Sequence, residues 1–448
     1  MVDSQNEWTQ MPLEDCMEAI IDYRGKTPKK TSAGIPLVTA KIIKRGRIEE
    51  PAEFIAPSDY DDWMRRGIPE PGDVVLTTEA PLGEVAQLDE RKIALAQRVI
   101  TLRGKEHLLD NTFLKYLLIS EPIQDKLKAR ASGTTVLGIK QSELRKVTLS
   151  FPPLPEQRAI ASILGALDDK IELNRRMNAT LESLARAIFK SWFVDFDPVK
   201  INAGQMPADS YDPTLLSLFP STFQDSELGP IPEGWNVEPV GKHVVIKHGY
   251  AFKGEFFSKE PRRDVLLTPG NFAIGGGFKG DKLKYYEGPV EEEYILLPGD
   301  LLVTMTDLSK AGDTLGYPAF VPESLKYRYL HNQRLGRVFI NDDSPVGAAF
   351  IHESFRTSRY RSHVLGTASG STVKHSSPTR IRDHEIAVGT PEVHALFEER
   401  VSPLVEAITR NDRVSMRLGA IRDRLLPELL SGRLVVMNSK GTPEQLIA

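Results

Sequence analysis

Two kinds of polar motif occur twice in this chain, and their side chains are of types that bind nucleic acid. Gln97-Arg98 returns as Gln333-Arg334, and Ser132-Gly133-Thr134-Thr135 returns as Ser369-Gly370-Ser371-Thr372. Glutamine, arginine and hydroxyl side chains can hydrogen-bond to base edges and to phosphates. A Ser-Gly-Thr loop can also be a simple turn, and Gln-Arg before a strand can simply cap a sheet edge. Residue type alone leaves both interpretations open.

The candidate DNA contacts share two properties, a polar or basic side chain and a place in a predicted loop. They are Lys26, Arg45, Arg47, Gln97, Arg98, Thr134, Thr135, Lys140, Arg262, Arg263, Asn271, Gln333, Arg334, Ser371, Thr372 and Lys374. We expect Lys140 and Lys374 to contact opposite halves of a target.

Motifs that would indicate catalysis are incomplete. Gly25-Lys26-Thr27 resembles the end of a phosphate loop, but Ile20 stands where its first glycine belongs. Gly275, Gly277 and Gly280 fit a dinucleotide-binding spacing, yet the residues after them do not open a helix, which favours a glycine turn. The nine histidines have no close metal-binding spacing. We predict no catalytic residue and no metal site.

Composition indicates a soluble protein of more than one domain. A chain of 448 residues exceeds one ordinary core, and no apolar run has the length of a bilayer span. The single cysteine, Cys16, excludes a disulfide framework and favours a reducing cytoplasm. The net charge of −4 argues against coating nucleic acid by bulk charge. Local basic clusters such as Lys41, Lys44, Arg45 and Arg47 remain compatible with a local contact.

The elements that position the repeated motifs are themselves repeated. Pro71-Gly72-Asp73-Val74-Val75 returns 227 residues later as Pro298-Gly299-Asp300-Leu301-Leu302. The polar motifs return at 236 and 237 residues, so the second copy contains about ten additional residues, mostly around 307–312. The chain is therefore interpreted as an internal duplication.

Each copy ends in a long heptad pattern. The first seam consists of Ile160, Leu164, Leu167, Ile171, Asn174, Asn178, Leu181, Ala185, Ile188 and Trp192. The alternating steps of four and three are typical of a helix that supercoils around a partner. The second seam lies 237 residues later, and its polar positions, Asn411 and Ser415, match Asn174 and Asn178. We infer that the two helices pair with each other.

Two orientations of this pair make different predictions. A parallel pair sets Asn174 against Asn411, whereas an antiparallel pair sets Asn174 near Ser415 and Asn178 near Asn411. The antiparallel form is preferred because it places the two globular parts at opposite ends. The seam spans roughly 48 Å at 1.5 Å per residue, which corresponds to about 14 base pairs of B-form DNA.

The predicted fold class is α+β, with two globular domains separated by an antiparallel two-helix coiled coil and related by an internal pseudo-two-fold repeat. Strands are predicted at 74–78, 98–102, 301–305 and 337–340, and a helix at 111–129. The prolines of 194–233 predict an extended linker. The predicted segments are 1–151 and 234–390 for the two domains, 152–193 and 391–434 for the helices, 194–233 for the linker and 435–448 for a C-terminal tail.

Several ordered motifs resemble the DNA specificity subunit of type I restriction-modification systems. They are Pro152-Pro153-Leu154-Pro155-Glu156-Gln157, Ser191-Trp192-Phe193-Val194-Asp195-Phe196-Asp197-Pro198, Ser226-Glu227-Leu228-Gly229-Pro230-Ile231-Pro232-Glu233-Gly234-Trp235 and Leu425-Leu426-Pro427-Glu428-Leu429-Leu430-Ser431-Gly432. These motifs lie within roughly 151–240 and 392–434, and the globular parts match only loosely.

The resemblance implies a non-catalytic subunit that reads a bipartite, asymmetric DNA target with two target-recognition domains. It implies two modification subunits, which bind S-adenosylmethionine and methylate adenine at N6. It also implies two restriction subunits, which use ATP and Mg and cut DNA, while this chain binds no cofactor. The second copy has Gly389-Thr390-Pro391-Glu392-Val393-His394 where the first has the Leu-Pro-Glu-Gln core, and Pro403 lies within the second helix. Both departures bear on whether the docking sites for the two modification subunits are equivalent.

Two other functions also fit the sequence. A duplicated coiled-coil scaffold would join other proteins without touching DNA, and a self-sufficient DNA enzyme would carry an unrecognised site.

Overall fold

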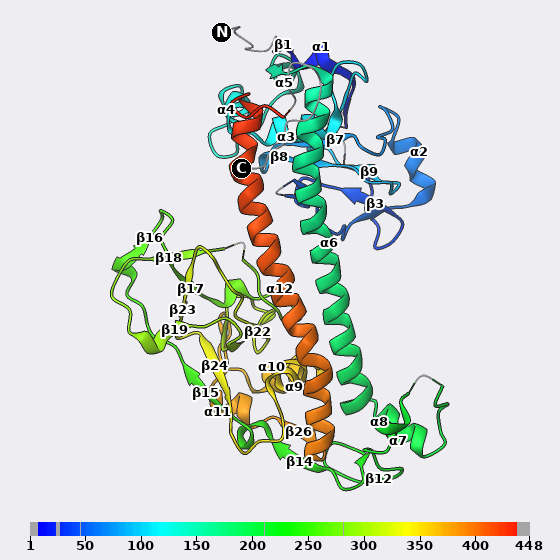
Figure 1. Cartoon of the computed structure of the whole chain (residues 1–448), viewed down its shortest axis with the longest axis vertical. Coiled ribbons are helices and arrows are strands. Elements are labelled where there is room, and N and C mark those ends of the chain that lie inside the picture. The colour runs from blue at the N-terminus through cyan, green and yellow to red at the C-terminus, as the bar shows by residue number, and fades with distance from the viewer. Residues whose placement is uncertain (1–7, 24–26, 45, 210, 281, 437–448) are drawn as a thin grey trace. The chain divides into compact units, whose positions relative to one another are not determined.

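The computed structural model describes residues 8–23, 27–44, 46–209, 211–280 and 282–436. The chain divides into two compact units, the first formed by residues 1–170 and 418–448 and the second by residues 171–417. Each unit contains a globular part and a stretch of both long helices, α6 (Leu154–Phe193) and α12 (Pro391–Leu430). Figure 1 labels the elements.

The first unit contains an antiparallel four-stranded sheet in the order β2-β10-β7-β8. A second sheet has the order β6-β3-β9, in which β3 and β9 are parallel, and β1 pairs with β11. The bounds are β1 Thr9–Pro12, α1 Leu13–Cys16, β2 Met17–Asp22, β3 Ile35–Val38, β4 Ile43–Lys44, β5 Arg47–Ile48, β6 Phe54–Ile55, α2 Tyr60–Trp63, β7 Val74–Thr78, β8 Leu82–Gln87, β9 Ala94–Leu95, β10 Val99–Gly104, α3 Asn111–Ile119, α4 Glu121–Ala129, α5 Gln141–Arg145 and β11 Thr148–Phe151.

The second unit contains an antiparallel four-stranded sheet in the order β15-β24-β20-β22. Its second sheet has five strands in the order β16-β18-β17-β23-β19, and β14 pairs with β26. The bounds are α7 Asp197–Asn202, α8 Pro213–Leu216, β12 Phe223–Gln224, β13 Ile231–Pro232, β14 Asn236–Pro239, β15 Val244–His248, β16 Phe257–Ser258, β17 Asp264–Leu267, β18 Lys284–Tyr286, β19 Ile295–Leu296, β20 Leu301–Thr304, β21 Thr306–Asp307, β22 Pro318–Phe320, β23 Arg328–His331, β24 Leu335–Ile340, α9 Ala348–Ser354, α10 Ser358–Thr367, β25 Lys374–His375, α11 Pro378–Arg382 and β26 Glu385–Val388.

The four-stranded sheets of the two units have the same topology. In each sheet the first strand along the chain pairs with the last, the last pairs with the second, and the second pairs with the third. In each unit the first short strand pairs with the last one before a long helix, as β1 with β11 and β14 with β26. This agrees with the predicted duplication. The second sheets differ, since one has three strands and the other five.

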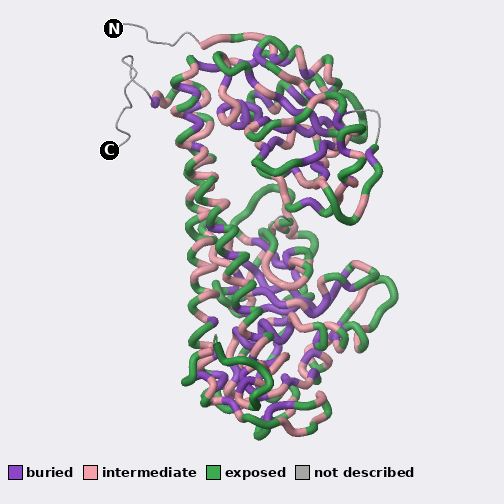
Figure 2. The backbone as a smooth tube through the Cα atoms, turned by 90° about the vertical axis from the view of Figure 1, so that its right-hand side faces the viewer, coloured by how far each residue is buried: buried purple, intermediate pink, exposed green. Residues whose placement is uncertain are grey.

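Apolar residues form the interior of each unit, and buried residues follow the strands and the inward faces of the long helices (Figure 2). In the first unit Leu13, Phe151 and Leu164 share one apolar cluster with Leu429, which comes from the end of α12. In the second unit Phe193 and Phe397, one from each long helix, pack edge to face with ring centroids 5.2 Å apart. The long helices are thus part of both cores.

The helix predicted at 111–129 is two helices. It is interrupted at Ser120, whose backbone is extended (φ −61°, ψ 143°), and α4 then begins with Glu121 and Pro122. Proline has no N–H to donate to a preceding turn and is favoured in the first turn of a new helix. The strand predictions at 74–78 and 301–305 agree with β7 and β20 within one residue.

The prediction of an extended linker at 194–233 is wrong. This segment contains the short helices α7 and α8, and its apolar residues Val199, Leu215 and Phe219 are buried in the core of the second unit. Its prolines do not prevent this, because both helices carry a proline in the first turn, where no N–H is needed.

The seam of α6 and α12 has the antiparallel register. The Asn174 Nδ2 donates to the Ser415 Oγ at 3.1 Å and to the Asn411 backbone oxygen at 3.3 Å, and the Asn411 Nδ2 donates to the Asn178 Oδ1 at 2.9 Å. All four residues lie in the second unit, so the hydrogen bonds fix the pairing inside one compact body. The helix α12 continues through Pro403.

In the first unit a half-buried charged group also joins both long helices to the globular part. The Asp168 carboxylate of α6 accepts hydrogen bonds from the Arg422 guanidinium of α12 at 2.7 Å and from the Tyr116 hydroxyl of α3 at 2.7 Å, and the Lys115 Nζ lies 3.3 Å away. Burial alone would raise the pKa of Asp168, but Lys115 and Arg422 hold it below its usual value. The positions 237 residues apart in the second unit are Ala185 and Val405, which pack in its apolar core.

The motif difference between Gln157 and His394 concerns internal packing. Gln157 is fully buried, donates to the backbone oxygens of Pro152 (2.8 Å) and Leu108 (3.0 Å), and accepts from the Asp110 N–H. His394 is also fully buried, accepts from the Gly389 N–H at 3.1 Å, and stacks on the Phe193 ring. Both side chains therefore anchor the start of a long helix to its own unit.

Candidate nucleic-acid interface

In the first unit three separate segments meet at the end of β7. The Thr78 N–H donates to the Arg98 oxygen at 3.0 Å, and the Ile139 N–H donates to the Thr78 oxygen at 3.0 Å. Glu79 forms an isolated bridge with Gly138, and its carboxylate lies 3.5 Å from the Arg98 guanidinium. The Gln97-Arg98 pair and the loop after Ser132 are thus neighbours, although 34 residues separate Arg98 from Ser132.

The second unit repeats this arrangement at the end of β20. The Met305 N–H donates to the Arg334 oxygen at 2.9 Å, and the Ser376 N–H donates to the Met305 oxygen at 2.9 Å. The short strands β21 and β25 then pair Thr306 with His375. The structure therefore brings Gln-Arg and Ser-Gly motifs together twice, around the same place in the same sheet topology.

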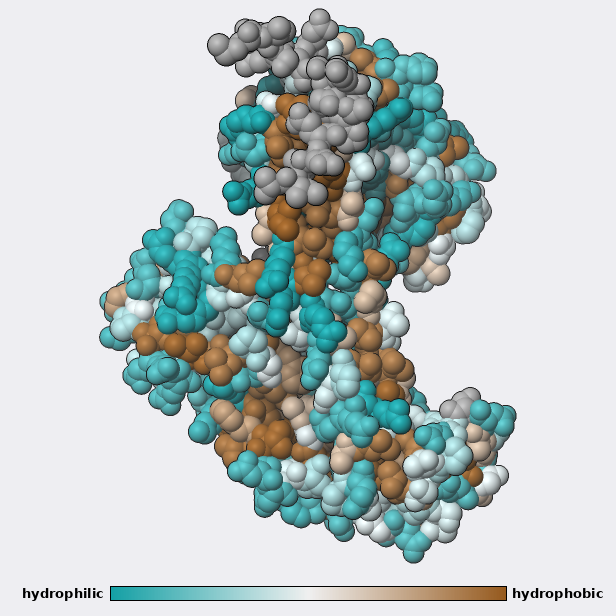
Figure 3. Space-filling view, in the orientation of Figure 1, coloured by the Kyte–Doolittle hydropathy of each residue, from teal (hydrophilic) through white to brown (hydrophobic). Residues whose placement is uncertain are grey.

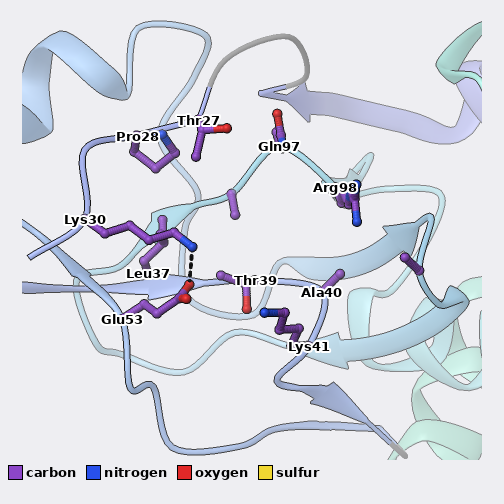
Figure 4. Close-up of a pocket in the computed structure, with 12 residues that line it drawn as sticks. Thr27, Pro28, Lys30, Leu37, Thr39, Ala40, Lys41, Glu53, Gln97 and Arg98 are labelled. Atoms are coloured by element: carbon purple, nitrogen blue, oxygen red, sulfur yellow. Dashed lines mark ion pairs between the residues drawn. The ribbon is translucent and has the colours of Figure 1, made fainter.

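A cavity of about 260 Å³ opens beside this site in the first unit (Figure 4). Lys30 forms an ion pair with Glu53 at 2.9 Å in its wall, and the side chains of Lys41 and Gln97 approach it from different segments. Arg98 is exposed, with 49% of its side chain accessible. The cavity is lined by Thr27, Pro28, Lys30, Leu37, Thr39, Ala40, Lys41, Glu53, Ala80, Ala96, Gln97 and Arg98.

Sequence reasoning missed Lys30, Thr39 and Lys41 as site residues. Lys41 belongs to a basic cluster of the sequence, and that cluster is a signal from which it could have been predicted. Lys30 and Thr39 carry no such signal, because contacts between distant segments place them in the cavity wall. Thr39 follows β3, which pairs with β9, and Lys30 forms its ion pair with Glu53.

The additional residues of the second copy form an anchored loop beside its own site. The Asp307 carboxylate accepts from the Ser309 N–H and from the Thr314 hydroxyl, both at 2.7 Å. Burial alone would raise the pKa of Asp307, but these hydrogen bonds hold it below its usual value. Asp307 also pairs with Lys374 in the β21–β25 ladder, so the insertion is next to the Ser-Gly loop.

Several predicted contacts lie elsewhere or have a structural role. Asn271 is fully buried and donates to the backbone oxygens of Lys279 and Lys282, so the prediction that it contacts DNA is wrong. Arg262 and Arg263 precede β17, at the opposite end of the β17–β23 pair from Gln333, and Arg262 pairs with Glu287.

The remaining candidates divide by their place in the first unit. Arg47 lies in the β4–β5 hairpin and is not part of the cavity wall. Lys26 and Arg45 lie outside the described residues, as do residues 437–448 of the predicted tail.

Lys140 and Lys374 do not occupy equivalent positions in the two copies, and their contact with opposite halves of a target stays a prediction. The loops close between Ser132 and Gly138 and between Ser369 and His375, so Lys374 lies inside its loop. Lys140 follows its loop at the N-cap of α5, where the second unit has Ser377 before α11.

The glycines of the apparent dinucleotide motif form a turn. Gly275, Gly276 and Gly277 all have positive φ, and the next regular element after Gly280 is the strand β18. Across the described ranges, no group of three or more acidic, histidine or cysteine side chains could hold a metal ion. No described helix has the length and apolar character needed to cross a membrane.

Comparison with known proteins relates this chain to DNA specificity subunits. Residues 5–183 match the family model described as the type I restriction modification DNA specificity domain. The MjaIX type I specificity subunit of Methanocaldococcus jannaschii is 25% identical over 82% of this chain and 78% of its own length. The HindI specificity subunit of Haemophilus influenzae is 26% identical, over 72% of this chain and 77% of its own.

The fold has a solved counterpart as well. The crystal structure of the type I restriction-modification S subunit from M. genitalium covers 96% of this chain and 97% of its own, with a TM-score of 0.53 and 15% identity. This likeness concerns the fold. Residues 5–183 thus match a DNA specificity domain, and over most of its length the chain is similar to specificity subunits of type I restriction-modification systems, which confirms the resemblance seen in its motifs.

Proposed function

We propose that this chain is a non-catalytic subunit that reads a bipartite, asymmetric DNA target, with one half-site for each unit. One observation carries the proposal: the same convergence of Gln-Arg and Ser-Gly motifs occurs in both units, beside second sheets that differ. Two similar readers with different surroundings suit two half-sites of different sequence.

The paired long helices suit a spacer between the half-sites. Their antiparallel register is fixed by the amides of Asn174, Asn178 and Asn411, and a polar group in such a seam selects one register at a cost in stability. In this proposal the helices set the gap in the target, and the two globular parts select the bases.

The proposal assigns the chemistry to partner subunits. Two modification subunits would bind S-adenosylmethionine and methylate adenine at N6, and two restriction subunits would use ATP and Mg to translocate and cut DNA. This chain would bind no cofactor. The long helices offer a surface for two copies of one partner, since apolar residues are exposed along them (Figure 3). Met177 and Leu184 are 40% and 47% accessible, and Val414 and Ile421, 237 residues later, are 37% and 47% accessible.

We expect Leu184→Glu and Ile421→Glu each to remove one modification subunit from the complex. Each change places a charge where an apolar partner surface would be desolvated, which costs several kcal/mol without a counter-charge. Native mass spectrometry of the complex measures the stoichiometry. The exposed neighbour Ser183→Glu is the matched control and should leave both copies bound. Retention of two subunits by both apolar-site variants would reject this docking surface.

Methylome sequencing tests the proposal as a whole. Cells that express this chain with its modification subunit should carry N6-methyladenine in one split motif, and that motif should lose methylation when the chain is deleted. A strain lacking only the restriction subunit is the control and should keep the methylation. An unchanged methylome in an expressing strain would favour the scaffold function. Methyl transfer by the isolated chain would favour an enzyme.

A further inference from the structure

The two Ser-Gly loops have the same backbone hydrogen bonds. In the first unit the Ser132 N–H donates to the Gly138 oxygen (2.8 Å) and the Gly138 N–H returns to the Ser132 oxygen (2.9 Å). In the second unit Ser369 and His375 exchange the same pair of bonds at 2.9 and 2.8 Å. Both loops therefore close over five residues with one geometry.

A glycine is required at the same place in both loops. Gly133 and Gly370 have φ values of +114° and +91°, in the region that favours glycine. A Cβ atom would lie 2.2 Å from the Val136 oxygen in one loop and 2.0 Å from the Val373 oxygen in the other. The shared Ser-Gly sequence is thus explained by the shared turn, but the hydroxyl residues after it are not.

These hydroxyl residues point to a ligand. Thr134, Thr135, Ser371 and Thr372 are all exposed. Within the described part of the chain, none of their hydroxyl groups has a hydrogen-bond partner, so the turn does not use them. Each loop lies beside an exposed arginine, Arg98 or Arg334. The residue that follows each loop, Ile139 or Ser376, bonds to the same strand-end residue as that arginine does. Two hydroxyls and a guanidinium are a donor set that suits a phosphate diester.

The Ser-Gly loops are shared by the two units, whereas the second sheets differ between them. Two half-sites of an asymmetric target differ in their bases, and the feature that they share is the sugar–phosphate backbone. A loop that is the same in both units is therefore suited to contact the sugar–phosphate backbone. The second sheets, and the anchored insertion at Asp307, differ between the units and are suited to the bases.

We propose that the two Ser-Gly loops are phosphate clamps, in which Thr134 and Thr135, or Ser371 and Thr372, act with Arg98 or Arg334 on the DNA backbone of each half-site. Discrimination between bases then belongs to the divergent segments. This inference rests on the proposed function, since it needs DNA at both units.

The test uses the full chain in complex with its modification subunit and two duplexes. One duplex carries the methylated motif, and the other has both half-sites scrambled. We expect Thr134→Val with Thr135→Val to weaken binding to both duplexes by the same factor, about 10-fold for two lost hydrogen bonds. Ser371→Ala with Thr372→Val should do the same. The exposed Thr148→Val is the matched control in the first unit and should leave both affinities unchanged.

A chemical probe locates the contact. A neutral methylphosphonate replaces single phosphates along each half-site in turn. At the clamped phosphate it should weaken binding by the wild-type complex, and should add little in the loop variant, because both changes remove one interaction.

Three outcomes contradict the inference or its basis. A loop variant that loses affinity for the motif but not for the scrambled duplex would assign the loop to base reading, and unchanged affinity for both would make it a turn only. Either result overturns the clamp. If the wild-type complex does not distinguish the two duplexes, the proposed function itself is overturned.

Discussion

Acidification from pH 7 to pH 5 is expected to destabilise the second unit by several kcal/mol. Three of its histidines, His331, His384 and His394, are buried, and burial lowers their pKa values to about 4, about 3 and about 4. An unfolded histidine has a pKa near 6.5, so below that value the unfolded chain binds more protons than the folded one. The stability contributed by these three neutral histidines is fully present above pH 6.5 and is lost as the pH falls toward 4.

The magnitude follows from the size of the shifts. Each histidine contributes about 2 kcal/mol of destabilisation at pH 5, since one pKa unit is about 1.4 kcal/mol. Two carboxyl groups act in the opposite direction: burial raises the pKa of Glu398, and burial with the nearby Glu182 raises that of Asp412 to about 6. The histidine contribution exceeds theirs, so the net effect remains a loss.

Hydrogen exchange of the intact chain at several pH values measures this loss segment by segment. Peptides from α9 and α10 should lose protection between pH 6.5 and 5. His384→Phe should reduce the pH dependence, because phenylalanine has no group that binds a proton. The substitution breaks no described side-chain hydrogen bond to this ring. His107→Phe, an exposed site in the first unit, is the control. Equal pH dependence in wild type and His384→Phe would contradict the assignment of His384.

Asp168→Ala is expected to lower the free energy of unfolding of the first unit by about 3 kcal/mol. The change leaves Lys115, whose side chain is 9% accessible, without its counter-charge, and breaking a buried ion pair from one side costs about 3–5 kcal/mol. The lower end applies because burial already lowers the pKa of Lys115, so that this amine can lose its proton.

The interaction itself is measured by a double-mutant cycle in urea. Lys115→Met in the Asp168→Ala background should recover part of the loss, since no unpaired charge is then buried, and the coupling energy should be about 1–3 kcal/mol. The exposed Asp169→Ala controls for removal of a carboxylate from the same helix. If Asp168→Ala and Asp169→Ala unfold at the same urea concentration, the Asp168 carboxylate does not stabilise this unit.

The long helices were predictable because their signal is local and extended. The predicted ranges 152–193 and 391–434 agree with α6 and α12 to within a few residues. The polar seam positions also predicted the register, since a misplaced asparagine would be buried without a partner. The sheet order of the globular parts could not be obtained in this way, because it depends on pairings between distant strands such as β2 with β10.

The candidate site was predictable in part for a related reason. Duplication marked Gln97, Arg98 and the loop hydroxyls, because each motif appears twice. Duplication could not show that Thr78 bonds to both Arg98 and Ile139. It also could not show that Lys41 lines the same cavity as Gln97. Asn271 shows the opposite error: a polar residue in a predicted loop suits DNA contact by type, but its amide is used to hold the turn.

The composition of the first unit determines when it can finish folding. Its core includes Leu429 from the end of α12, alongside Leu13 and Phe151, although 247 residues of the second unit are synthesised in between. At about 10 residues per second, that interval is roughly 25 s. The part of the chain made first therefore waits on the ribosome with an incomplete apolar core. Of the two units, the one that contains Leu13 therefore has its core completed only after the other has been synthesised.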